Sequence, residues 1–185
     1  MKTKGWIVLG VIVLIVLILV GTLWGSYNGL VSGDENIKQK WANVQSAYQR
    51  RIDLIPNLVA TVKASADFEK KIQTDIAALR TGITDAKTPQ EIELFGQKIN
   101  TAINLVYENY PEIKSTEIFL SLNDQLEGTE NRIKVDRDNF NEAVKDYNIK
   151  VRRFPSNIVA GWFGFEVKTS FQADEGAEKV VNVEF

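Results

Sequence analysis

An uninterrupted apolar run lies near the start of the sequence. Residues 5–25 (GWIVLGVIVLIVLILVGTLWG) carry no charge, and about 20 apolar helical residues span the roughly 30 Å hydrocarbon core of a bilayer. Trp6 and Trp24 lie near its two ends, where indole rings favour the membrane interface. The alternative, a cleaved signal peptide, fits less well because the run is long and no small-residue cleavage site follows it. The pattern predicts an uncleaved transmembrane anchor with Trp6 and Trp24 at the membrane interface.

Beyond residue 36 the apolar positions recur in steps of three and four, which is the period of an amphipathic helix. Asp34 is a suitable N-cap for this helix and Gly82 a suitable end. Pro56 interrupts the pattern and either kinks the helix or begins a new one. The first stripe consists of Ile37, Trp41, Val44, Tyr48, Ile55, Leu58, Val62, Ile72, Ile76 and Leu79.

Two further helices follow. Thr88-Pro89-Gln90-Glu91 is a capping box with proline at the first helical position. The second helix ends or kinks at Pro111, and the third ends at Phe154-Pro155, because the residue before a proline avoids helical backbone angles. The second stripe consists of Ile92, Phe95, Ile99, Ala102, Val106 and Tyr110, and the third of Phe119, Leu122, Leu126, Thr129, Ile133, Phe140, Val144, Tyr147 and Val151.

These helices have narrow apolar faces that must pack against one another, and short connections favour antiparallel neighbours. The predicted fold is all-α: a transmembrane helix (residues 1–25), an elongated antiparallel up-and-down bundle of three to four long helices (26–154) and an irregular apolar C-terminal tail (155–185). In the tail, Phe165, Val167 and Phe171, and later Val181, Val183 and Phe185, alternate with polar residues as in a weak strand. Its aromatic residues either cap the bundle or contact the bilayer or a neighbouring subunit.

Composition excludes several classes of site. The formal net charge is −2, and a nucleic-acid surface would need clustered Lys and Arg, so no nucleic-acid partner is expected. The chain has neither Cys nor His, which removes thiol chemistry, the usual general base and the commonest metal ligand. Lys2 and Lys4 before the apolar run favour a cytoplasmic N-terminus and an extracytoplasmic domain by the positive-inside rule.

Charged residues interrupt the first stripe within RRIDLIPNLV, residues 50–59. Continuing its spacing places Arg51 and Glu69 on the apolar face. A partly buried arginine needs a carboxylate partner, so we expect Arg51 to pair with Glu108 or Glu130 across the bundle. Such a pair would fix the register of the helices. The alternative is a ligand site built on Arg50 and Arg51.

Four segments resemble the LemA family: YNGLVSGDENIKQKW (residues 27–41), RRIDLIPNLVATVK (50–63), ENYPEIKSTEIFLSLNDQLEGTENRI (108–133) and RDNFNEAVKDYNIKVRRFPSNIVA (137–160). The resemblance implies a bacterial single-pass membrane protein with a helical-bundle domain and an extracellular N-terminus, opposite to the charge argument. It provides no catalytic residues. Two local departures are Asp67-Phe68-Glu69, where many relatives have a histidine before the glutamate, and Gly128 within the last long helix. The family-motif and structural residues are Arg50, Arg51, Asp53, Pro56, Asn57, Glu69, Glu108, Pro111, Glu130 and Arg137.

The expected function is a non-enzymatic scaffold or adaptor in the bacterial cytoplasmic membrane, involved in membrane or envelope organisation. Expected partners are the lipid bilayer, further copies of the chain and other membrane or envelope proteins. The alternative is a membrane-bound sensor or receptor that binds a small ligand or partner within the bundle. No cofactor is expected, since di-iron bundles rely on Glu-x-x-His motifs and the chain has no His.

Overall fold

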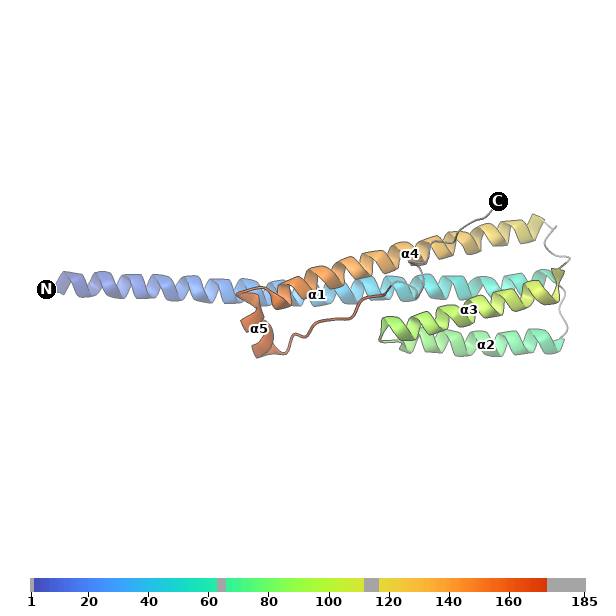
Figure 1. Cartoon of the computed structure of the whole chain (residues 1–185), viewed down its shortest axis with the longest axis horizontal. Helices are drawn as coiled ribbons and strands as arrows, with labels where there is room; N and C mark the ends of the chain where they lie inside the picture. Colours follow the sequence, from blue (N-terminus) through green and yellow to red (C-terminus); the bar gives the residue numbers. More distant parts are fainter. Residues whose placement is uncertain (1, 63–65, 112–116, 173–185) are drawn as a thin grey trace, which may run out of the picture. The chain divides into compact units, whose positions relative to one another are not determined.

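The computed structural model describes residues 2–62, 66–111 and 117–172. Over these residues the protein consists of helices and connections without a β-strand, which confirms the all-α prediction. The five helices are α1 (Lys2–Thr61), α2 (Ala66–Asp85), α3 (Pro89–Asn109), α4 (Glu117–Arg152) and α5 (Ser156–Phe163) (Figure 1).

The chain divides into two compact units. We call Met1–Ala42 with Glu142–Lys168 the anchor unit, and Asn43–Asn141 with Thr169–Phe185 the bundle unit. The anchor unit contains the N-terminal part of α1, the C-terminal part of α4, and α5. The bundle unit contains the rest of α1, α2, α3 and most of α4.

In the anchor unit, α1 carries the apolar run with its large side chains exposed. It is the one described helix long and apolar enough to cross a membrane. The predicted helix start at Asp34 is wrong, because α1 continues through this position. The Asp34 carboxylate instead forms ion pairs with the ammonium groups of Lys38, at 2.9 Å, and Lys168, at 3.1 Å.

The remainder of the anchor unit packs through small and aromatic side chains. Gly33 lies against Tyr147, and a Cβ at Gly33 would lie 2.9 Å from the Tyr147 ring. Helix α5 ends at Gly164, whose φ of 72° suits a residue without a side chain. The strand pattern of the tail is wrong for residues 165–172, which form no regular structure. Val181, Val183 and Phe185 lie outside the described residues.

In the bundle unit, inter-helix contacts give the direction of each helix. On α1 and α2, Gln45 contacts the carbonyl of Ile83, whereas Asp53, later in α1, contacts Arg80, earlier in α2. The two helices are therefore antiparallel.

Helices α2 and α3 are also antiparallel, because Phe68, early in α2, stacks on Tyr110 at the end of α3, whereas Gly82, late in α2, lies against Phe95, early in α3. With α3 and α4 related in the same way, the predicted up-and-down bundle is confirmed, with four helices among the described residues.

Helices α3 and α4 show the relation at widely spaced points. Glu93, near the start of α3, pairs with Arg137, while Tyr107, near its end, stacks on Phe119 at 5.2 Å. The predicted stripes supply most of the core. Fully buried large side chains in this unit are Val44, Ile52, Ile55, Leu58, Ile72, Ile83, Ile92, Ile99 and Val106.

Proline does not break the first long helix. Pro56 lies inside α1, although an interior proline costs about 3 kcal/mol through a lost hydrogen bond and a steric clash. Ile52, Ile55 and Leu58 around it are fully buried, so packing offsets that cost. Helices α1 and α2 are separate, and α2 ends at Asp85 rather than at Gly82.

The predicted start of α3 is confirmed. The backbone N–H of Glu91 donates to the Thr88 hydroxyl at 3.2 Å, and the Glu91 carboxylate accepts from the N–H of Thr88 at 3.3 Å and of Lys87 at 2.7 Å. The Lys87 hydrogen bond is the main reason that the pKa of Glu91 is lowered. The end predicted at Pro111 also holds, since α3 ends at Asn109.

Candidate functional site

Arg51 lies at the centre of the polar contacts within the bundle unit. Its side chain is 12% exposed and forms an ion pair with Glu130 of α4. It also donates to the carbonyl of Leu126, at 3.2 Å, and to Oδ1 of Asn100 on α3, at 3.0 Å. One side chain of α1 therefore holds both α3 and α4, as a guanidinium fork with several donors can do.

Of the two partners predicted for Arg51, Glu130 forms the ion pair, whereas Glu108 is exposed. The Glu130 side chain is 57% exposed, so its carboxylate stays hydrated while the guanidinium enters the core. Within the described residues, the Nε of Arg51 is the one buried side-chain nitrogen or oxygen without a hydrogen-bond partner. The contact fixes the position of α1 more than it adds stability, because a partly hydrated pair contributes little net energy.

A second charged contact joins α3 and α4. Arg137 pairs with Glu93, and both side chains are mostly buried. The guanidinium carbon of Arg137 also lies 4.6 Å from the ring centroid of Phe171, which stacks on Phe140. The Asn141 amide holds the backbone of Phe171 through two hydrogen bonds. Sequence reasoning named Arg137 but missed Glu93, which follows the buried Ile92 directly.

The contacts between α1 and α2 are more exposed. Asp53 accepts two hydrogen bonds from Arg80, at 2.6 and 3.1 Å, and both side chains are more than half exposed. The Gln45 amide donates to the carbonyls of Ile83, Thr84 and Ala86. Those carbonyls lie at the end of α2, where intrahelical donors run out, so Gln45 caps a neighbouring helix.

Asp136 on α4 is buried, and sequence reasoning missed it. Its carboxylate accepts a hydrogen bond from Arg132, one turn earlier, at 2.8 Å. The signal was available, because Asp136 continues the stripe three residues after Ile133 and four before Phe140. An opposite charge at i−4 is the second indication, since such pairs stabilise helices.

Arg50 and Arg51 face different surroundings, so they do not build one ligand site. Arg50 is exposed and lines a groove of about 440 Å³ between α1 and α4 with Gln125, Thr129 and Arg132. A smaller adjoining pocket of about 230 Å³ includes Arg50, Arg132 and the buried Asp136. This surface presents two guanidinium groups to solvent and suits an acidic ligand or partner.

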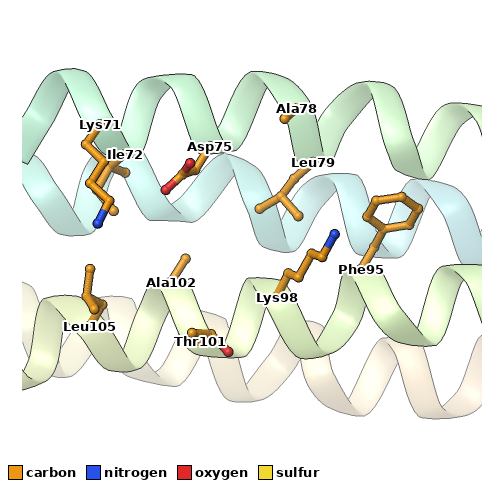
Figure 2. A pocket seen from close by; sticks show the side chains of 10 residues that line it. All are labelled: Lys71, Ile72, Asp75, Ala78, Leu79, Phe95, Lys98, Thr101, Ala102 and Leu105. Carbon is orange, nitrogen blue, oxygen red and sulfur yellow. The ribbon is translucent and has the colours of Figure 1, made fainter.

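Helices α2 and α3 enclose a second groove of about 450 Å³ (Figure 2). Its walls are mostly apolar, with Leu79 on α2 and Phe95 on α3, and Lys71, Asp75 and Lys98 supply charge. The Lys98 ammonium lies 5.3 Å from the centroid of the Phe95 ring. In the described part of the chain, acidic side chains nowhere gather in a group of three or more that could hold a metal ion.

The other predicted residues are dispersed. Asn57 and Pro111 are exposed, and Pro56 is half-buried. Glu69 is exposed rather than on the apolar face, and it accepts a hydrogen bond from Gln73. The break between α1 and α2 resets the helical phase. The neighbouring Phe68 is therefore partly buried instead, and its ring stacks on that of Tyr110, the C-cap residue of α3.

The predicted interfacial tryptophans differ in their neighbours. Trp6 and Trp24 are both largely exposed along α1. Trp24 also lines an apolar groove with residues of α5. An exposed indole near each end of the apolar run is the arrangement typical of a membrane-spanning helix.

Comparison with known proteins places the chain in a family. The model of the LemA family matches residues 40–185. Protein LemA of Metamycoplasma hominis is 24% identical across 82% of this chain and 71% of its own length. Magnetosome protein MamQ 2 of Paramagnetospirillum magneticum is 26% identical across 86% of this chain and 70% of its own length. With its apolar N-terminal helix, this chain is a membrane-associated protein and belongs to the LemA family.

Proposed function

We propose that this protein is a non-enzymatic scaffold, anchored in the bacterial cytoplasmic membrane by residues 5–25, that associates with further copies of itself and organises membrane or envelope components. The domain lies on the extracytoplasmic side, in keeping with the charges before the anchor. One similar protein is named a magnetosome protein, which supports a role at a membrane structure.

The observation that carries the proposal is that Arg51 joins three helices of the bundle unit. Its guanidinium contacts α3 and α4 together, so its charge positions helices. Arg137 and Glu93 serve the same end between α3 and α4. Charged residues committed to helix positioning favour a domain that presents a fixed surface to partners.

Self-association is supported by the exposed surface of the bundle unit. Leu94, Ile118, Leu120 and Val135 are large apolar side chains more than half exposed, and a contact between copies would remove their apolar surface from water. Native mass spectrometry of the full-length chain in mild detergent tests this proposal. We expect dimers or larger species across a range of detergent concentrations, and a strictly monomeric protein would contradict it.

The side of the membrane needs its own experiment. Protease added to spheroplasts should digest the helical domain if it is extracytoplasmic. Detergent-permeabilised cells provide the control in which either orientation is digested. Protection in intact spheroplasts would reverse the proposed orientation and leave the scaffold role standing.

A second candidate function is a sensor that binds a small acidic ligand. The observation in its favour is the groove lined by Arg50 and Arg132. Inorganic phosphate and succinate are suitable probes, with binding measured by the rise in melting temperature of the full chain. Paired Arg50→Gln and Arg132→Gln changes should abolish that rise, whereas Lys71→Gln, in the groove between α2 and α3, should leave it unchanged.

A further inference from the structure

The anchor unit contains a groove that the scaffold role leaves unexplained. It has a volume of about 390 Å³ and lies between α1 and the short helix α5, which Figure 1 shows beside α1. Val20, Leu23 and Trp24 line it from α1, and Val159, Trp162 and Phe163 line it from α5. The lining is almost wholly apolar, which suits a hydrocarbon ligand.

The position of this groove along α1 is informative. Val20 and Leu23 belong to the uncharged run of residues 5–25, and Trp24 stands at its end. When that run crosses a bilayer, these residues lie at the edge of the hydrocarbon core, where indole rings favour the interface. The groove is therefore continuous with the lipid-facing surface of the anchor.

Specific contacts hold α5 at this level. Phe163 packs on Tyr27 of α1 with ring centroids 4.8 Å apart, and Phe165 lies 5.9 Å from the same ring. Val159 and Ala160 of α5 are buried. The N–H of Phe165 donates to the Ala160 carbonyl at 3.0 Å, which closes the end of α5.

Aromatic side chains on α5 and just before it keep much of their surface exposed. Trp162 is 71% exposed and Phe163 61%, and Phe154, just before the helix, is also exposed. Exposed aromatic side chains are unfavourable in water but suit the boundary between lipid headgroups and acyl chains. Arg152 and Arg153, both exposed, precede the helix and supply charge complementary to lipid phosphate.

We propose that this groove seats an acyl chain of a membrane phospholipid and that α5 is a second membrane contact, lying in the interface of the leaflet on the domain side. The lipid occupant follows from the continuity of the groove with the anchor and from the adjacent arginines. The inference rests on anchoring by residues 5–25, but it is independent of self-association.

Depth-dependent fluorescence quenching tests the proposal. The full chain carries four tryptophans, so Trp6→Phe, Trp24→Phe and Trp41→Phe together leave Trp162 alone. The matched control keeps Trp41 alone, beyond the apolar run on α1. In phosphatidylcholine vesicles with brominated acyl chains, we expect Trp162 to lose most of its fluorescence and Trp41 to keep most of it. Equal quenching of the two would overturn the proposal.

A groove-filling change tests the acyl-chain seat itself. Asn28 lines the groove, so Asn28→Phe in the Trp162-only chain should block lipid entry and reduce quenching. Asn36→Phe is the control, because Asn36 is exposed on the same helix outside the groove. Circular dichroism checks that both variants stay helical. Undiminished quenching in Asn28→Phe would refute the seat.

Two further readouts separate the possible failures. Alkaline extraction reports the anchor: release from the vesicles would overturn both anchoring and this inference, whereas retention with Trp162 unquenched would overturn this inference alone. Cross-linking through Trp162→Cys, in the otherwise cysteine-free chain, tests whether a second copy of the protein occupies the groove. Efficient cross-linking through this position, combined with absent quenching, would replace lipid by protein.

Discussion

The two units hold their helices together by different means. In the bundle unit, charged side chains reach across three helix pairs: Arg51 of α1 pairs with Glu130 of α4, Arg80 of α2 with Asp53 of α1, and Arg137 of α4 with Glu93 of α3. In the anchor unit, the contacts are small against aromatic, as with Gly33 and Tyr147, or aromatic against aromatic, as with Tyr27 and Phe163. Directional contacts fix register in water, whereas close packing without charge also works beside lipid.

The sharpest way to break this comparison is to remove the central charge of the bundle unit. Arg51→Ala deletes the ion pair with Glu130 and the hydrogen bonds to Leu126 and Asn100. We expect the free energy of unfolding to fall by about 2 kcal/mol, less than for a fully buried pair because Glu130 remains hydrated. Urea unfolding of the full chain in detergent, followed by circular dichroism, measures it.

The adjacent Arg50 provides the matched control. It is exposed, so Arg50→Ala should change the free energy of unfolding by no more than about 0.5 kcal/mol. Equal losses of unfolding free energy in the two variants would mean that Arg51 acts through its charge alone and not through its specific contacts. Arg51→Leu separates register from stability: unchanged melting and an unchanged pattern of inter-helix cross-links would refute the register role.

Periodicity predicted most of this architecture because burial of one face dominates long helices. The stripes through Ile92 and Ile99, and the box at Thr88, required only local chemistry and appeared as predicted. The helix ends predicted at Asp34 and Gly82 do not occur. Either residue can lie inside a helix when tertiary contacts stabilise it there. Asp34 meets two lysines, and Gly82 lies against a ring of α3.

The polar contacts were predictable only in part. Spacing placed Arg51 on the inner face and gave Glu130 as one of two partners. It could not choose between Glu130 and Glu108, because the choice depends on how the helices are rotated about their axes. The groove beside Arg50 was also hidden, since its Arg132 lies far along the sequence on α4.

The next prediction concerns close packing in the anchor unit. A Cβ at Gly33 would lie 2.9 Å from the Tyr147 ring, which is buried, whereas a Cβ at Gly29 would meet nothing within 4 Å. Gly33→Ala should therefore lower stability by about 1–2 kcal/mol through overpacking. Gly29→Ala should raise it by up to about 1 kcal/mol through helix propensity. Melting temperatures in detergent test the pair, and equal values would refute close packing here.

Helix ends sharpen the comparison at a smaller scale. In the bundle unit, side chains cap α3 through Thr88 and Glu91. Thr88→Ala should lower the free energy of unfolding by about 1 kcal/mol. Thr101→Ala is the control, because Thr101 is exposed in the middle of α3 and alanine is the better helix former. A loss as large at Thr101 as at Thr88 would remove the cap from the explanation.

The smallest effect belongs to the charged cluster of the anchor unit, which departs from that unit's general rule. Burial raises the pKa of Asp34, but hydrogen bonds and charge from Lys38 and Lys168 outweigh it and hold the pKa below its ordinary value. The ionised carboxylate therefore stabilises the folded state at neutral pH. That contribution is complete above pH of about 4 and is lost as the pH falls through the folded-state pKa.

Asp34→Asn should remove this contribution while keeping the size of the side chain. We expect the variant to be less stable than the natural chain by no more than about 1 kcal/mol at neutral pH, because the lysines are largely exposed. The difference should shrink below pH of about 4, as the natural carboxylate takes up a proton. Urea midpoints measured across this range test it. A difference that widened on acidification would mean that burial of the Asp34 carboxylate outweighs the effect of the lysines.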